Sequence, residues 1–154
     1  MKSTKVVVGG TFDLLHDGHK ALFEKALEIG HLLLIGLTTD KMVTESNKKH
    51  KVSPYFERKK RLRNYFGKKG VSNRVKIVPI GDPYGPSIKD QDIDAIVVSK
   101  ERTERAKEIN RIRLCRGLQP LKIVIVNMIL AEDGVPISTT RIKRGEIDRK
   151  GHLL

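Results

Sequence analysis

The chain has 154 residues, of which 38% are hydrophobic and only 5% aromatic, and its formal net charge is +13. This length suits one domain with a sizeable aliphatic core, and we expect a single domain over residues 1–154. The single cysteine, Cys115, excludes an internal disulfide and fits a reducing compartment, and no apolar run approaches the roughly 20 residues of a membrane span. We therefore expect a soluble, cytoplasmic protein with no membrane partner.

Short apolar runs alternate with helical patterns from the start of the chain. Residues 5–8 are rich in valine and run into glycines, which predicts a short buried strand. A helix is expected over about 17–29, with Gly30 as its C-terminal stop, followed by a second buried strand over 31–38. Two buried strands joined by a helix form a βαβ unit, which implies a parallel sheet.

The same alternation continues to the C-terminus. Residues 39–51 are expected as a loop or short helix, and Ser53-Pro54 predicts a helix start, with Ser53 as N-cap and Pro54 at the first helical position. That helix should run to about Phe66 and stop near Gly67 or Gly70. Further strands are expected over 74–80, 94–99 and 121–126, a long helix over 103–116, and a last short helix opening at 136–140. The pattern predicts an α/β fold with a single open, doubly wound sheet of five parallel strands.

The segment GGTFDLLHDGH, residues 9–19, lies between the first strand and the first helix. A strand, a glycine turn and a helix start are the context in which backbone N–H groups hold a phosphate. His16 and His19 stand three residues apart, with Gly18 between them. Coincidence or helix capping is the plain alternative, and metal ligation is another, because histidines at this spacing can chelate. No other histidine or cysteine has motif spacing, so we interpret the segment as a nucleotide-phosphate site.

A second candidate is PISTTRIKR, residues 136–144. The plain alternative is an ordinary N-cap with a basic helix tail. Three consecutive hydroxyls, Ser138 to Thr140, exceed what capping requires, and hydroxyls with free N–H groups and an arginine or lysine form a phosphate clamp. We favour the clamp.

These segments are expected at one edge of the sheet. In doubly wound sheets, ligands bind beyond the carboxyl ends of the strands, near the switch in strand order. Residues 9–19, 38–41 and 99–105 directly follow predicted strands, and 138–144 comes some way after the fifth. Lys41 stands just after a strand end, which makes it a candidate for a phosphate contact. Cys115 is interpreted as a small buried apolar residue rather than a nucleophile.

Taken together, residues 10–19 and 137–143 resemble the two signatures of the HxGH nucleotidyltransferase superfamily. The chain is similar to the archaeal phosphopantetheine adenylyltransferases over nearly its whole length, including 57–59, 98–102 and 108–113. The resemblance implies a Rossmann-like nucleotidyltransferase fold and a role in coenzyme A biosynthesis. The implied reaction transfers the adenylyl group of ATP to 4′-phosphopantetheine, giving dephospho-coenzyme A and pyrophosphate, with Mg²⁺ bound together with ATP.

The resemblance also implies roles for individual residues. His16, His19 and Lys41 would be catalytic, with His19 stabilising charge in the transition state, and Thr11 and Lys41 would contact the acceptor phosphate. The implied ATP-binding residues are Gly9, Gly10, Thr11, Phe12, His16, Gly18, His19, Arg102, Ser138, Thr139, Thr140 and Arg141. No protein ligand to a metal is expected among them.

Elementary phosphate chemistry fits this reaction. A phosphate monoester has a second pKa near 6, so at neutral pH it is largely a dianion and needs no general base. Its approach to a tetra-anionic triphosphate instead requires donors and cations around an in-line geometry. We therefore expect direct attack without a covalent intermediate.

Two alternatives remain open. A sister enzyme would use another phosphomonoester, such as nicotinamide mononucleotide or glycerol phosphate. The basic charge also admits a nucleic-acid-binding module, since the two motifs are similar to the signatures of class I synthetases, although the charge fits a lysine- and glutamate-rich, thermophile-like surface too. The chain is too short for an added tRNA-reading domain and has few aromatics for base stacking. We expect ATP and phosphopantetheine as partners, no nucleic acid, and a monomer.

Overall fold

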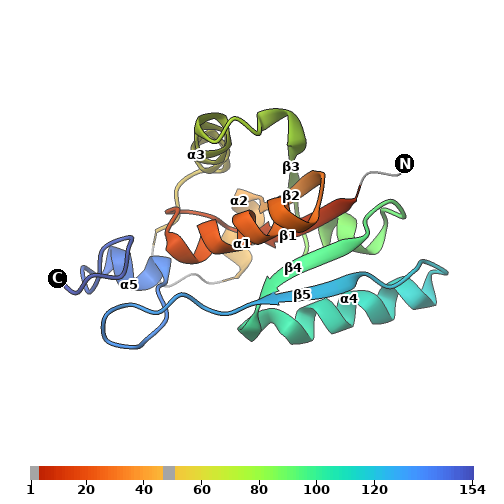
Figure 1. The fold of residues 1–154 in the computed structure, drawn as a ribbon. Coiled ribbons are helices and arrows are strands. Elements are labelled where there is room, and N and C mark those ends of the chain that lie inside the picture. Colours follow the sequence, from red (N-terminus) through yellow and green to blue (C-terminus); the bar gives the residue numbers. More distant parts are fainter. Residues whose placement is uncertain (1–3, 47–50) are drawn as a thin grey trace.

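A computed structural model of the chain describes residues 4–46 and 51–154, and that part of the chain forms a five-stranded parallel sheet (Figure 1). The strands, in spatial order, are β3 (Val75–Ile80), β2 (Leu32–Thr38), β1 (Lys5–Gly10), β4 (Ala95–Ser99) and β5 (Lys122–Val126). The order reverses between β1 and β4, the position at which doubly wound sheets bind ligands. The predicted α/β fold is confirmed.

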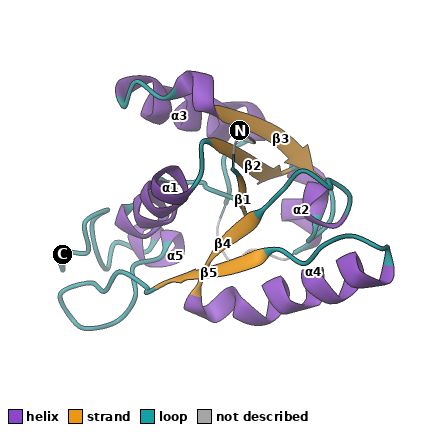
Figure 2. Cartoon of the chain, turned by 45° about the vertical axis from the view of Figure 1, so that its right-hand side comes forward, coloured by secondary structure: helices purple, strands orange, loops and turns teal. Residues whose placement is uncertain are grey.

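Helices cover both faces of the sheet. On one face lie α1 (Asp17–Ile29) and α3 (Tyr55–Lys68), and on the other lies α4 (Thr103–Cys115), so that α1 and α4 flank β4 and β5 from opposite sides (Figure 2). The short helix α2 (Asp40–Glu45) follows β2, and α5 (Thr139–Lys143) lies near the start of α1 (Figure 1). None of the described helices is long and apolar enough to cross a membrane.

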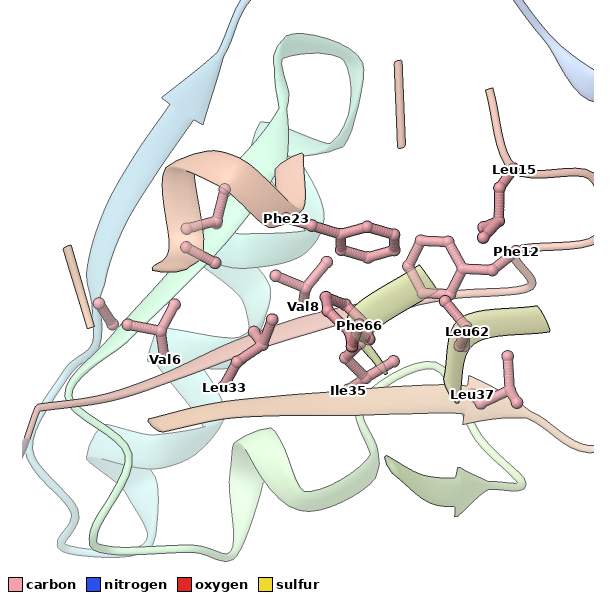
Figure 3. Packing of buried hydrophobic residues seen from close by; sticks show 13 residues of the cluster. Val6, Val8, Phe12, Leu15, Phe23, Leu33, Ile35, Leu37, Leu62 and Phe66 are labelled. Carbon is pink, nitrogen blue, oxygen red and sulfur yellow. The ribbon is translucent and has the colours of Figure 1, made fainter. Parts of the chain in front are cut away.

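One run of valines in β1 supplies both layers of the core. Val6 and Val8 pack with Phe23 of α1 and Phe66 of α3 (Figure 3), whereas Val7 packs on the α4 side. Side chains alternate along a strand, so a strand that is covered on both faces must be apolar at every position. This is why β1 reads as a continuous apolar run.

The predicted start of α3 is wrong. The helix begins at Tyr55 with Pro54 as its N-cap, and it ends at Lys68, where the glycines at 67 and 70 predict its end. Ser53 makes tertiary contacts in place of a cap: its backbone N–H donates to Asp13 Oδ1 at 3.1 Å, and its hydroxyl accepts from Arg61 at 3.1 Å.

The interpretation of Cys115 as a buried residue is also wrong, because its side chain is exposed at the end of α4. The buried positions of α4 are Ala106, Ile109 and Arg113, which share one face of the helix. Arg113 is fully buried because its guanidinium donates to three backbone carbonyls, those of Ser87, Asp90 and Gln119. Cys115 lies outside this stripe.

Candidate active site

The central strands part at their carboxyl ends. Strands β1 and β4 pair only at Val6–Ala95 and Val7–Ile96, and beyond that point β1 stays with β2 while β4 stays with β5. Two pockets of about 270 and 330 Å³ open there. The two pockets share five lining residues among those that the structure describes, and these form their common floor: Gly9, Gly10, Thr11, Val98 and Arg102.

The two pockets have different walls. The first, here called the histidine pocket, is completed by His16 and His19, by residues 126–129 after β5 and by residues 137–140. The second, called the α2 pocket, is completed mainly by apolar side chains of α2, β3, α4 and the loop 83–87. The structure thus brings 9–19, 38, 102 and 138–140 to one edge of the sheet, as the sequence predicts.

His16 and His19 cap the helix that carries them. His16 is the N-cap of α1, and its Nδ1 accepts the backbone N–H of Gly18 at 3.0 Å, while the backbone N–H of His16 donates to His19 Nδ1 at 3.4 Å. The rings stack with centroids 3.8 Å apart. A Cβ atom on Gly18 would lie only 2.8 Å from Cε1 of His16, so the capping ring requires glycine at this position. Capping and pocket lining are therefore combined in the same two side chains.

Both imidazoles are neutral at physiological pH. Burial lowers the pKa of His16 to about 4, and burial together with the neighbouring His16 lowers the pKa of His19 to about 3. Because Nδ1 of His16 accepts a hydrogen bond from Gly18, the proton of its neutral ring is assigned to Nε2. His16 therefore carries a ring N–H donor that the cap does not use.

Phe12 supports this arrangement by packing. Its backbone is left-handed, with φ of 47°, which costs an L-residue roughly 1–2 kcal/mol. The buried ring offsets this cost by packing on Phe23 at a centroid distance of 5.1 Å (Figure 3). It also lies nearly perpendicular to the ring of His19, with the centroids 5.2 Å apart. A Cβ atom on Gly10 would lie 2.8 Å from this ring, which explains the glycine. Phe12 thus acts as a platform for His19.

The hydroxyl segment reaches the histidine pocket from the far end of the chain. Ser138 is the N-cap of α5, and its Oγ accepts the backbone N–H of Arg141 at 3.2 Å. Ser138, Thr139 and Thr140 all line the pocket. As with the histidines, the plain capping role and the pocket-lining role hold together.

Asp13 joins α5 to the loop between β1 and α1, which ends at His16. Its carboxylate is 2% exposed and lies 2.6 Å from the ammonium group of Lys143 on α5, and it accepts the backbone N–H of Ser53. Burial by itself raises the pKa of Asp13, but the hydrogen bonds from Lys143 and Ser53 outweigh burial and leave this pKa below its ordinary value. Lys143 also donates to the carbonyl of Lys51. No role for Asp13 is predicted from the sequence, because no local pattern indicates a contact between such distant segments.

Two predicted site residues are not brought to the pockets. Lys41 is exposed in the first turn of α2 and lines neither of them. Arg141 is engaged within the C-terminal segment, where it pairs with Asp133 and Glu146 and donates to the carbonyl of Val135. Its charge is satisfied locally, so the structure offers no support for its predicted ATP contact.

Other pocket residues were not predicted from the sequence. Residues 126–129 comprise the last residue of β5 and the three that follow it, so the same strand-end argument could have found them. Tyr84, in a segment that reads as a plain turn, lines the α2 pocket. Arg58, which lines neither pocket, was also not predicted as a buried residue. It lies on the face of α3 that carries Leu62 and Phe66, and its helical spacing from these two residues could have indicated its burial.

The polar lining of the histidine pocket combines imidazoles and hydroxyls with Arg102 and the carboxylates of Asp13 and Glu101, and apolar side chains complete it. Among residues 4–46 and 51–154, no three histidine, cysteine, aspartate or glutamate side chains gather closely enough to hold a metal ion. The site is built from hydrogen-bond donors, which suit phosphate oxygens.

Comparisons with known proteins agree with this geometry. The model of the cytidylyltransferase-like family matches residues 7–145. The phosphopantetheine adenylyltransferase of Methanopyrus kandleri is 50% identical over 144 residues, covering 94% of this chain and 90% of that protein. The phosphopantetheine adenylyltransferase of Methanosarcina mazei is 49% identical over 152 residues, covering 97% and 96%.

A solved structure extends the likeness at the level of fold alone. The tyrosyl-tRNA synthetase of Archaeoglobus fulgidus superimposes with a TM-score of 0.70 at 12% identity, covering 92% of this chain and 60% of that one. The chain belongs to the cytidylyltransferase-like family, in the branch that the archaeal phosphopantetheine adenylyltransferases represent.

Proposed function

We propose that the chain transfers the adenylyl group of ATP to 4′-phosphopantetheine, producing dephospho-coenzyme A and pyrophosphate. The observation that carries this proposal is the pair of unlike pockets that share one floor at the switch between β1 and β4. A transfer between two bound substrates needs such a junction, where the donor phosphate meets the acceptor phosphate. The identity to relatives named for this activity supports the choice of substrates.

The triphosphate is assigned to the histidine pocket. His16 and His19 offer neutral imidazoles, and residues 138–140 offer hydroxyls, so phosphate oxygens would find donors on both sides. Arg102 lines both pockets and supplies positive charge at their junction. Apolar side chains from β4 and from residues 126–129 complete this pocket and suit a base.

The acceptor is assigned to the α2 pocket. Met42, Val43, Tyr84 and Ile109 give it mostly apolar walls, which suit the long, uncharged arm of phosphopantetheine. The phosphate of the acceptor would then lie at Thr11, which lines both pockets.

The proposed chemistry is a direct in-line displacement. An oxygen of the acceptor phosphate dianion forms a bond to the α-phosphorus, and the bond from that phosphorus to the bridging oxygen of pyrophosphate breaks. The nucleophile needs no base, so the side chains of His16, His19 and Thr11 serve as hydrogen-bond donors to the charge that develops.

Magnesium would enter with the nucleotide. The described residues hold no cluster of three potential metal ligands, and Mg²⁺ commonly keeps water and phosphate oxygens as most of its ligands. We therefore propose no protein-bound metal and assign no step to the ion.

We also propose that the enzyme works as a monomer in the cytoplasm and binds no nucleic acid. Both pockets are completed by residues of a single chain, and the one cysteine is free and exposed, which fits a reducing compartment. Light scattering of the purified protein measures its mass in solution.

The deciding experiment measures pyrophosphate release from ATP with a panel of acceptors. We expect turnover with phosphopantetheine and none with nicotinamide mononucleotide or glycerol 3-phosphate, and no comparable turnover when CTP replaces ATP. Turnover with another acceptor but not with phosphopantetheine would contradict the proposal. Tight, salt-dependent RNA binding without any turnover would instead favour the nucleic-acid alternative.

A further inference from the structure

Thr11 occupies a special position between the pockets. Among the described residues that line both of them, Thr11 alone carries a hydroxyl group. Its backbone precedes the strained turn at Phe12, which holds it at the end of β1. The direction in which this hydroxyl points its proton therefore matters for any phosphate at the junction.

A second hydroxyl fixes the first. Thr38 ends β2, is 6% exposed, and donates its hydroxyl proton to Thr11 Oγ1 at 3.1 Å. The same Thr38 oxygen accepts a hydrogen bond from Nη1 of Arg58 at 3.2 Å.

Arg58 anchors this chain of hydrogen bonds. It is fully buried, and a buried cation is costly unless its donors are satisfied. Its guanidinium also donates to the carbonyl oxygens of Thr11 at 3.0 Å and Ser53 at 2.8 Å, and to Asp40 at 3.0 Å. Arg58 therefore holds Thr11 twice, directly through the backbone and indirectly through Thr38.

The hydrogen bonds from Arg58 to Thr38 and from Thr38 to Thr11 both run in one direction. A guanidinium can only donate, so Arg58 occupies one lone pair of the Thr38 hydroxyl, and that hydroxyl in turn donates its proton to Thr11 Oγ1. Thr11 receives this hydrogen bond on its oxygen, which leaves its own proton for an acceptor in the pockets. The positive charge at the head of the chain polarises both hydroxyls in the same sense.

We propose that Arg58 and Thr38 are positioning residues that hold Thr11 as a hydrogen-bond donor to the phosphates reacting at the junction of the two pockets. The inference rests on the proposed transfer reaction, because it concerns how this reaction is assisted. An oriented donor acts mainly when charge develops in the transition state, so its loss lowers kcat more than it raises KM.

The test compares four variants with the wild type: Thr38→Val, Thr38→Ser, Thr11→Val and the double variant Thr11→Val/Thr38→Val. Thr38→Val keeps the shape of the side chain but removes its hydroxyl, and we expect kcat to fall about 10-fold to 100-fold with the KM for ATP changed less than about threefold. Thr38→Ser should restore most of kcat. In the Thr11→Val background, adding Thr38→Val should lower kcat less than about twofold further. The reason is that Arg58 and Thr38 act through the hydroxyl of Thr11; we call these linked hydrogen bonds the relay.

Thr44→Val is the matched control, because Thr44 is exposed on α2, its hydroxyl donates to the carbonyl of Asp40 in the same helix, and it lines neither pocket. Thermal unfolding of each variant separates a loss of fold from a loss of rate. Full, multiplicative losses in the double variant, or a Thr38→Ser variant as slow as Thr38→Val, would overturn the relay. The assays use whichever acceptor the wild type turns over, so a wrong acceptor contradicts the proposed function and leaves this test intact.

Discussion

At the scale of single residues, the histidine pair shows how one motif serves structure and chemistry together. The same Nδ1 atoms that cap α1 fix the rings, and burial keeps both rings neutral, so in their proposed role as donors to the triphosphate they carry no charge of their own. Gly18 is required by the ring of His16 rather than by the backbone conformation. We therefore attribute the H-x-G-H spacing to the geometry of the cap.

Replacing His19 tests its proposed catalytic part. We expect His19→Ala to lower kcat by at least about 100-fold, because a donor to the transition state is lost, while the KM for ATP changes much less. Steady-state kinetics measures both constants, and circular dichroism checks that the fold is kept. A rise in the KM for ATP with unchanged kcat would show that His19 only binds the nucleotide.

We expect the fall in kcat/KM at acidic pH to result from protonation of the acceptor phosphate and not of the enzyme's histidines. The pKa values of His16 and His19, about 4 and 3, lie below the second pKa of a phosphate monoester near 6. We expect kcat/KM for the acceptor to fall below about pH 6 as its phosphate takes up a proton. An acceptor analogue with a lower second pKa should move this fall to lower pH. This assignment would be contradicted if the pH at which kcat/KM falls were unchanged with the analogue but shifted in a His16→Asn variant.

At the scale of elements, the site depends on a link between the two ends of the chain. Helix α5 carries the hydroxyls, and the buried contact between Lys143 and Asp13 joins it to the loop that carries the histidines. The backbone N–H of Asp17 also donates to the carbonyl of Arg149 at 3.2 Å, which brings the start of α1 to the C-terminal segment. These two contacts hold the halves of the histidine pocket next to each other.

Lys143→Met should loosen this link. The methionine keeps much of the side-chain length but removes the nearer of two cations that contact the buried Asp13 carboxylate, the other being Arg61 at 3.5 Å. We therefore expect the KM for ATP to rise several-fold and the free energy of unfolding to fall by about 1–3 kcal/mol. Enzyme kinetics and urea unfolding measure the two effects. Lys150→Met is the control, since the Lys150 side chain is exposed in the same segment. Equal changes in KM and in stability for the two substitutions would show that the loss of one positive charge, and not the loss of the contact with Asp13, causes them.

At the scale of the whole molecule, the buried ionisable groups make stability depend on pH. An unfolded histidine has a pKa near 6.5, whereas His16 and His19 in the fold have pKa values of about 4 and 3. Between these values the unfolded chain binds protons that the folded chain does not, so stability falls as the pH falls. Asp13 adds to the loss at lower pH still, because its folded pKa lies below the ordinary value of 3.8.

We therefore expect the free energy of unfolding to decrease from pH 7 to pH 4.5, by up to about 1.4 kcal/mol per pH unit for each histidine. Urea unfolding across this range measures the slope. The double variant His16→Asn/His19→Asn should show a shallower decrease. Parallel curves for the double variant and the wild type would place the pH dependence elsewhere.

The local patterns of the sequence were sufficient to predict the strands, most helices and the two motifs that line the histidine pocket. Alternation and helical spacing are local properties, and the carboxyl ends of parallel strands share an edge, so the position of residues 9–19 followed from the order of the elements. Capping was less predictable, because Ser53 contacts Asp13 and Arg61 in place of its own helix.

The sequence by itself determined the fold class, the family and the segments from which the site is built. Only the tertiary structure decided which charges and hydroxyls meet. It buried Arg58 against Thr11 and Thr38, joined Asp13 to Lys143, left Lys41 exposed and engaged Arg141 outside the pockets. The reason is physical: periodicity shows which face of an element is apolar, whereas the partner of a buried polar group depends on which distant segments the fold packs against it.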